Sequence, residues 1–241
     1  MTIPVIKDSS KAVSSAAGVT LTCLKPTADI NEDDFLILIC GNDYDSTANQ
    51  FSDSNKPSGW TFLGQEGNRT SDAHIGVYYK VASGSEGTVT VTTPRSEDWF
   101  MFYGIITGVD TATPINTSSF SFHGDTASHD IPSVTTTEDD CLILYGLSFN
   151  GADGYTYSVA GTGYSQEDQA QASGGSSGSS GCFGSRDLAT AGASGIATVT
   201  CSVSDGAAFF QLAINAGAAT PTLLPIMMNM NQFNGGIYET D

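Results

Sequence analysis

Residues 32–40 read EDDFLILIC, and residues 138–147 read EDDCLILYGL. In both stretches three carboxylates are followed by a short run of apolar residues. A continuous apolar run of this length, bounded by polar residues, is typical of a strand buried inside a β-sandwich. The recurrence predicts two related halves that fold against each other, each built around one of these two strands.

Further short strands follow each stretch in the same order, with turn residues between them. Strands spaced by roughly 8–12 residues with such turns indicate a sandwich or a jelly roll. We therefore expect an all-β, antiparallel β-sandwich of jelly-roll type with about ten to twelve strands. The expected strands of the first half, each with its counterpart in the second, are Trp60–Gln65 with Gly163–Gln166, Ala73–Ala82 with Cys182–Leu188, Thr88–Thr92 with Ile196–Val203, and Trp99–Thr107 with Ala207–Ala216.

The expected domain organisation is a single sandwich over residues 1–219, with pseudo-repeat halves at residues 19–116 and 131–217. Small polar residues predict a loop at Lys11–Gly18. The last segment, residues 220–241, differs in composition because it holds two prolines and three of the five methionines. It is expected to form an extended C-terminal arm.

Two interpretations of this arm stay open: a last strand with a frayed end, or an assembly arm that reaches onto a neighbouring subunit. Methionine-rich surfaces adapt readily to a partner. On the second interpretation the contacts come from the large apolar residues of the arm, which are Leu223, Leu224, Ile226, Met227, Met228, Met230 and Phe233.

The chain is strongly acidic, with 26 acidic and 8 basic residues and a formal net charge of −18. This charge argues against nucleic acid as a partner, because phosphate binding needs clustered Lys and Arg. It also disfavours an anionic membrane surface, and no run of the sequence approaches the roughly 18 apolar residues of a membrane span. The charge favours docking onto a basic surface.

The chain has five cysteines, an odd number in no framework spacing, which indicates synthesis in a reducing cytoplasm. Cys40 and Cys141 lie inside apolar runs and are expected in the core. The start MTIPVIKDSS lacks a basic region followed by an apolar core. We therefore expect no secretion signal.

The loop that contains Asn42, Asp43 and Asp45 is rich in oxygen ligands and could hold calcium. Its spacing is not that of an EF-hand, so a solvated acidic loop is favoured. His123 and His129 lie near two aspartates, but a metal site needs further ligands in suitable geometry. We expect a crossover loop between the two halves there, and neither a metal nor a cofactor.

The two acidic clusters, Glu32–Asp34 and Glu138–Asp140, are interpreted as turns that end at a buried strand. Their duplication favours a structural role over a unique active site. The GxSxG match at residues 174–178 lies in a low-complexity Gly- and Ser-rich tract and is composition, not a nucleophile elbow. Some pair among 26 acids will always resemble a glycosidase pair. We therefore expect no enzymatic activity.

Aromatic side chains near the loops offer a second kind of site, because exposed aromatics in long loops can stack on sugars. Trp60 is expected in the core, since it begins a strand after a turn. Tyr44 and Tyr155 are expected on the surface. The residues of this possible ligand-facing loop region are Asp43, Tyr44, Asp45, Phe51 and Tyr155.

Three segments then follow one another: PSGWTFLGQ at 57–65, VYYKVASGSEGTVTVT at 77–92 and TGVDTATPIN at 107–116. With TLTCLKP at 20–26 before EDDFLILI, they resemble a β-sandwich repeat of tailed-bacteriophage virion proteins and some bacterial surface proteins. The resemblance covers roughly Val19–Gly217, and VDTATPI, at Val109–Ile115, is its most specific part. The second half departs from the pattern, because its tryptophan is replaced by tyrosine and a Gly- and Ser-rich tract follows.

The resemblance implies a non-enzymatic virion structural protein, in particular a capsid decoration (cement) protein. The implied partners are other virion proteins, above all the major capsid protein, and further copies of the chain in a homo-oligomer. Its expected localisation is the virion. The alternative is a carbohydrate- or receptor-binding tail or fibre module with a glycan as ligand. The family pattern consists of core and turn residues, so no catalytic residues are carried over.

Overall fold

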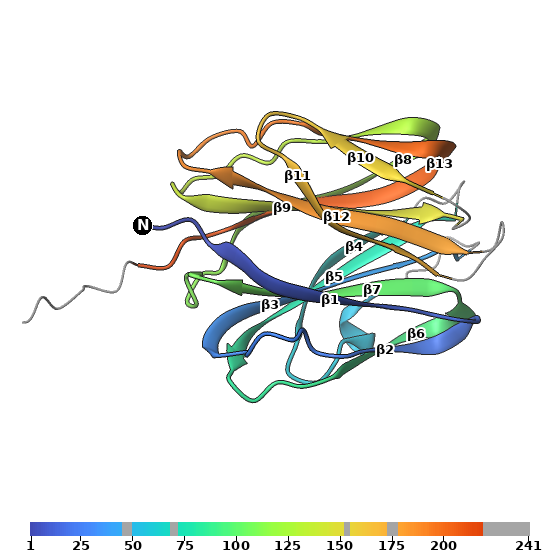
Figure 1. The fold of residues 1–241 in the computed structure, drawn as a ribbon, viewed down its shortest axis with the longest axis horizontal. Coiled ribbons are helices and arrows are strands. Elements are labelled where there is room, and N and C mark those ends of the chain that lie inside the picture. The colour runs from blue at the N-terminus through green and yellow to red at the C-terminus, as the bar shows by residue number, and fades with distance from the viewer. Residues whose placement is uncertain (45–49, 68–71, 152–154, 173–177, 219–241) are drawn as a thin grey trace, which may run out of the picture.

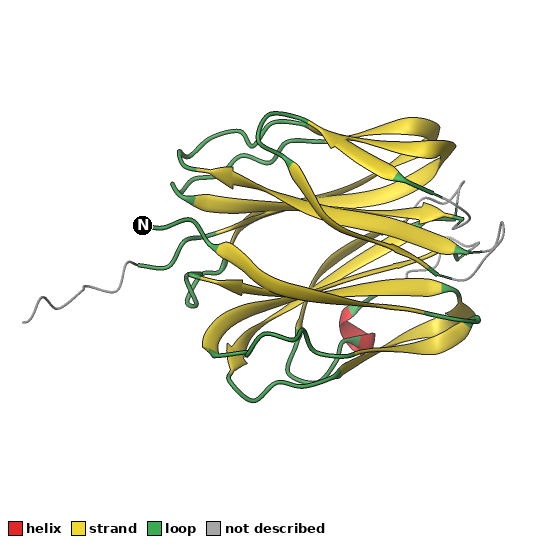
Figure 2. Cartoon of the chain, viewed as in Figure 1, coloured by secondary structure: helices red, strands yellow, loops and turns green. Residues whose placement is uncertain are grey.

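The computed structural model describes residues 1–44, 50–67, 72–151, 155–172 and 178–218. These residues form thirteen β-strands and one three-residue 3-10 turn, η1 at Asp53–Asn55. The strands lie in two large antiparallel sheets, stacked face to face, and a small two-stranded sheet (Figures 1 and 2). The all-β prediction is confirmed, with one strand more than the upper limit expected. No helix in the described part of the chain is long and apolar enough to cross a membrane.

The first large sheet has five strands in the order β1-β7-β3-β5-β4. The strand β3, which contains EDDFLILIC, is the central one and pairs with β7 on one side and β5 on the other. The bounds of these strands are Val5–Val13 for β1, Glu32–Asn42 for β3, Thr61–Gly67 for β4, His74–Ser83 for β5 and Trp99–Thr107 for β7.

The second large sheet contains the order β8-β13-β9-β12-β11, with β9, which begins at the cysteine of EDDCLILYGL, at its centre. The strand β13 has 18 residues, and its N-terminal part pairs with β10. The bounds are Ile115–Ile131 for β8, Cys141–Asn150 for β9, Tyr157–Ala160 for β10, Ser165–Gln171 for β11, Ser179–Leu188 for β12 and Ala197–Ile214 for β13. The small sheet pairs β2 (Gly18–Cys23) with β6 (Val89–Glu97).

The register of the two central strands differs from the letter-by-letter match of their sequences. Phe35 of β3 pairs with Ile106 of β7. Leu142 of β9, and not Cys141, makes the corresponding pair with Ile214 of β13. A one-residue shift exchanges the two faces of a strand. Phe35 and Leu142 accordingly both face the space between the large sheets.

Each large sheet is buried on both faces, which explains why the central strands are apolar without alternation. The core between the sheets contains Phe100, Phe102, Phe183 and Phe210. A second core lies between the first sheet and the β2–β6 sheet. The outer face of the second sheet carries two further cores.

Two segments expected as loops are strands. Lys11–Val13 continues β1, which pairs with β7 up to Val13. The region around His123 and His129 belongs to β8, a strand of 17 residues. Both segments are polar because they lie at sheet edges, where much of the strand remains partly exposed. The strand propensity of these polar residues therefore did not reveal the two strands, which form because they pair with the apolar strands β7 and β13.

Candidate functional site

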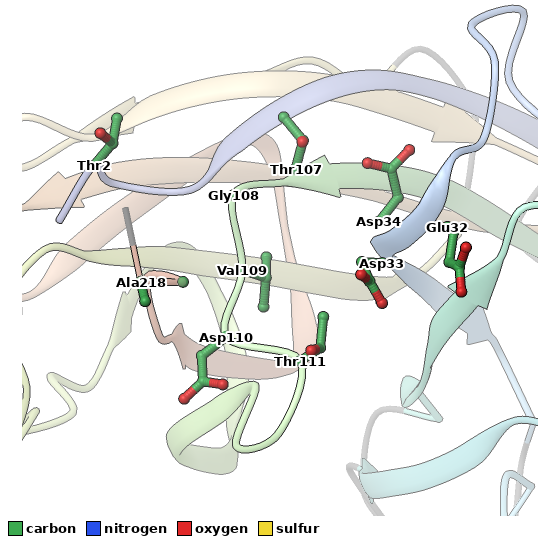
Figure 3. Close-up of a pocket in the computed structure, with 11 residues that line it drawn as sticks. Thr2, Glu32, Asp33, Asp34, Thr107, Gly108, Val109, Asp110, Thr111 and Ala218 are labelled. Carbon is green, nitrogen blue, oxygen red and sulfur yellow. The ribbon is translucent and has the colours of Figure 1, made fainter. Parts of the chain in front are cut away.

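The first and last described segments of the chain meet at one end of the sandwich, around a pocket of about 590 Å³. Figure 3 shows the carboxylates of Glu32, Asp33 and Asp34 on one side of this pocket and Asp110 on the other. The remaining walls come from the N-terminal segment, the residues after β7 and those after β13. They are Thr2, Thr107, Gly108, Val109, Thr111, Gly217 and Ala218.

A second pocket, of about 480 Å³, lies beside the second acidic cluster. It is lined by Glu138 and Asp139, shares Asp110 with the first pocket, and includes Asn116 and Asn215. Together the acidic residues of the two pockets make up what we call the acidic end: Glu32, Asp33, Asp34, Asp110, Glu138 and Asp139. Such a concentration of one sign of charge attracts cations and cationic side chains.

The first acidic cluster forms a turn before β3. Asp33 adopts a left-handed backbone conformation with φ of 70°, which Asp tolerates better than most residues. The carboxylate of Asp34 is buried, accepts a hydrogen bond from the Asn31 backbone N–H at 2.8 Å and pairs with Lys7 at 3.2 Å. These contacts agree with the interpretation of the cluster as a turn that ends at a buried strand.

The second acidic cluster makes the corresponding turn one residue later in the sequence. Here Asp140 has the positive φ, 59°, and Asp139 accepts a hydrogen bond from the Ala191 backbone N–H at 2.7 Å. Asp140 also lies 3.1 Å from the amino group of Met1. The position that follows the left-handed residue is Asp34 in β3 but Cys141 in β9.

The segment VDTATPI joins the two sheets at the acidic end. Val109 forms an isolated antiparallel bridge with Ala216, and the Asp110 backbone N–H donates to the Asn215 carbonyl at 3.0 Å. The Asp110 carboxylate accepts from the Thr113 hydroxyl at 2.6 Å, a bond that lowers the pKa of Asp110. We call this connection the junction. Its Asp110 was not singled out from the sequence, because only the fold brings it to both acidic clusters.

The possible ligand-facing loop region does not form an exposed aromatic surface. Phe51 is fully buried against Trp99, with ring centroids 6.3 Å apart. Tyr155 is 8% exposed and donates a hydrogen bond to Asp205 at 3.0 Å. The expectation that Tyr155 lies on the surface is therefore wrong, and Phe51, grouped with it as a possible ligand-facing residue, is also buried: the two side chains belong to apolar cores. Tyr44 is half-buried beside His74, and Asp45 lies outside the described residues.

Asp43 is the member of this group with unusual chemistry. Its side chain is buried, and this burial, reinforced by Glu97, Asp98 and Asp72, raises the pKa of Asp43 to about 7. Among the described residues, one of its carboxylate oxygens has no hydrogen-bond partner, and neither has the side-chain amide of the buried Asn42. The expectation of a solvated loop is wrong for Asp43.

The two histidines stack on each other, with ring centroids 5.8 Å apart. His129 is fully buried, and burial lowers its pKa to about 4. Its Nε2 lies 2.9 Å from the Thr126 carbonyl oxygen, and its ring packs on Phe149. Within the described ranges, no three His, Cys, Asp or Glu side chains are grouped so that they could hold a metal ion.

The predicted core residues lie where they were expected. Trp60 is 5% exposed and packs edge-on against Tyr103. All five cysteines are buried and free. The predicted contact residues of the C-terminal arm all lie outside the described residues, which end at Ala218 beside the acidic end.

Comparisons of the chain with models of known protein families, with curated proteins and with solved structures found no match.

Proposed function

We propose that the protein is a non-enzymatic structural protein of a bacteriophage virion and acts as a capsid decoration (cement) protein. The observation that carries this proposal is the resemblance of residues 57–116 to the sandwich repeat of tailed-phage virion proteins. Its most specific segment, VDTATPI, forms the junction between the two sheets. The most specific residues of the resemblance thus hold the two sheets together, as expected for a module whose role is structural.

The duplication of the two halves and the jelly-roll type of the sandwich belong to the same proposal. The strand order β1-β7-β3-β5-β4 and the order β8-β13-β9-β12-β11 match position by position. The edge strands β4 and β11 also occupy corresponding places, and each begins two residues after a glycine of positive φ. These glycines are Gly59, at 78°, and Gly163, at 79°. Two copies of one unit account for both similarities.

The proposed mechanism places the arm, residues 220–241, between capsid subunits. The described residues end at Ala218, which lines the first pocket next to the junction, at one end of the sandwich. An arm together with a sheet edge could bury roughly 1,600 Å² in total, which is the usual size of a specific interface. The acidic surface would face solvent or basic capsid patches.

The test is a truncation that ends at Ala219, mixed with capsids that lack the protein and sedimented with them. We expect the truncated chain to keep its circular dichroism spectrum and thermal transition but to attach at least about tenfold more weakly, a loss of about 1.4 kcal/mol. Equal attachment of the truncated and full chains would show that the arm is not the contact.

A further inference from the structure

The two large sheets meet along two lateral edges, which we call the β4–β8 seam and the β1–β11 seam. Among the described residues, large apolar side chains fill the first seam, whereas the second contains a pocket. In the β4–β8 seam, Leu63, Tyr79 and Phe120 pack against the core between the sheets. Tyr79 stacks on Phe35 with ring centroids 5.5 Å apart. Large apolar side chains therefore close this side of the molecule.

In the β1–β11 seam the corresponding positions carry smaller or charged residues. Ser185 pairs with Leu144 as Tyr79 pairs with Ile37. Glu167 is the bulged residue of β11, as Leu63 is of β4. The remaining two changes are Leu142 in place of Phe35 and Asp187 in place of Val81.

A pocket of about 280 Å³ results from these replacements. One wall is apolar and consists of Pro4, Val5, Ile6 and Leu142; the other carries Glu167, Ser185 and Asp187. Pockets for whole small-molecule ligands measure roughly 300–1,000 Å³. The volume therefore suits a single long side chain better than a complete ligand.

Among the described residues, no basic side chain forms an ion pair with Glu167 or Asp187. Glu167 accepts hydrogen bonds from the hydroxyls of Ser165 and Ser185, which leave its charge in place. Arg186 bonds to the Ser194 carbonyl and lies over the Tyr164 ring, on the opposite face of β12. Lys11, further along β1, pairs with Asp168 at 2.7 Å. Lys7 pairs with Asp34.

We propose that this pocket receives a lysine or arginine side chain from an extended basic segment of a partner protein. The aliphatic stem of such a side chain packs against Val5, Ile6 and Leu142, and its charged head reaches Glu167 and Asp187. The arm of the same chain, or of another copy, is not the occupant. It contains no Lys or Arg and carries Glu239 and Asp241.

This inference deepens the proposed function, since it names the chemistry of a partner surface, and it rests on that function only for the partner's identity. The net charge of −18 brings a basic segment toward the molecule. The pocket would then fix where one of its side chains lies.

The probe is a hexalysine peptide, titrated into the full chain and followed by the methyl NMR signals of Val5, Ile6 and Leu142. We expect these signals to shift, and we expect no shift with a peptide of six Nε-acetyl-lysines. Asp187→Asn should weaken binding about threefold, as for one exposed ion pair. Ser185→Tyr, which recreates the filled seam, should weaken it about tenfold or more.

Asp53→Asn is the charge-matched control, because Asp53 is exposed on η1 and paired only with Lys56 in the described structure. An equal loss of affinity in Asp53→Asn and Asp187→Asn would reduce the effect to general charge attraction and overturn the proposal. Unshifted methyl signals, or equal binding of the acetylated peptide, would also overturn it. The peptide titration needs no virus particle. A negative result in it can therefore be distinguished from a failure of the protein to attach to capsids.

Discussion

The two lateral seams show how the same strand order can be closed by different chemistry. Lys11 of β1 and Phe120 of β8 occupy corresponding positions, since they pair with Phe102 and Phe210. Phe120 crosses to Gly64 of β4, where a Cβ atom would approach its ring to 2.7 Å. Lys11 crosses instead to Asp168 of β11. One seam is therefore sealed by an aromatic ring over a glycine, and the other by an ion pair beside an open pocket.

The two large sheets are alike in strand order and share one core between them. The lateral surfaces differ, and the β1–β11 seam is where we propose that a partner binds.

The largest effects are expected in the shared core. Phe102 and Phe210 occupy corresponding positions and are both essentially buried. Phe102→Ala and Phe210→Ala should each lower the free energy of unfolding by about 3–5 kcal/mol, because each leaves a large cavity. Equilibrium urea denaturation measures both. Costs that differ by more than about 2 kcal/mol would contradict the correspondence of the two positions.

Asp43 and His129 should contribute to the pH dependence of stability with opposite signs, each by about 2 kcal/mol over a window from about pH 4.5 to about pH 6.5. The pKa of Asp43, raised to about 7 from 3.8, makes the folded state bind the extra proton. Its contribution therefore falls as the pH rises. The pKa of His129, lowered to about 4 from 6.5, makes the unfolded state bind the extra proton, so its contribution rises with pH.

The two variants that separate these opposing slopes are Asp43→Asn and His129→Leu. The leucine matches Leu21, which occupies the corresponding position in β2. Stability of Asp43→Asn should rise with pH across the window, and that of His129→Leu should fall, in urea denaturation at fixed ionic strength. Identical pH profiles of the two variants would refute the assignment.

The two seams should respond differently to truncation. Phe120→Ala is expected to cost about 2 kcal/mol, less than a fully buried phenylalanine, because Phe120 is partly exposed. Lys11→Ala is expected to cost less than about 1 kcal/mol, and this cost should shrink in high salt. Thermal and urea denaturation at two salt concentrations separate the outcomes. A larger cost for Lys11→Ala would mean that the ion pair, and not the ring, is the stronger closure.

The smallest effects concern the one-residue offset between the acidic clusters. Asp33→Gly and Asp140→Gly should change stability by no more than about 0.5 kcal/mol, since glycine readily adopts a positive φ. Asp139→Gly should cost about 1 kcal/mol, because it removes the hydrogen bond to Ala191 and adds chain entropy. A cost at Asp140 as large as that at Asp139 would support the letter-by-letter alignment instead.

Much of the fold follows from the sequence, because most of the apolar runs are strands. The central strands, the aromatic strand Trp99–Thr107 and the buried Trp60 were all predicted. The polar strand β8 was not, since its residues are stabilised by pairing with β13 and carry no apolar pattern of their own. The register of β9 was also missed. The letters EDD are identical in the two stretches, but the residue with positive φ is the second of the three in one, Asp33, and the third in the other, Asp140.

The candidate site was harder to predict, because its residues come together only through the pairing of distant strands. The acidic clusters were visible in the sequence, but their meeting at Asp110 depends on the junction between the sheets. Phe51 and Tyr155 were misplaced because a loop position does not show whether an aromatic ring turns inward. The seam pocket has no sequence signal, since it is lined by residues that lie far apart in the sequence.

The central proposal, that the protein decorates a capsid through its arm, is tested most directly by a cryo-EM map of the intact particle. We predict density for the sandwich on the outer face of the head, with residues 220–241 inserted between capsid subunits. Density for the protein at the tail or a fibre tip, or a head-bound sandwich whose arm makes no capsid contact, would contradict the account.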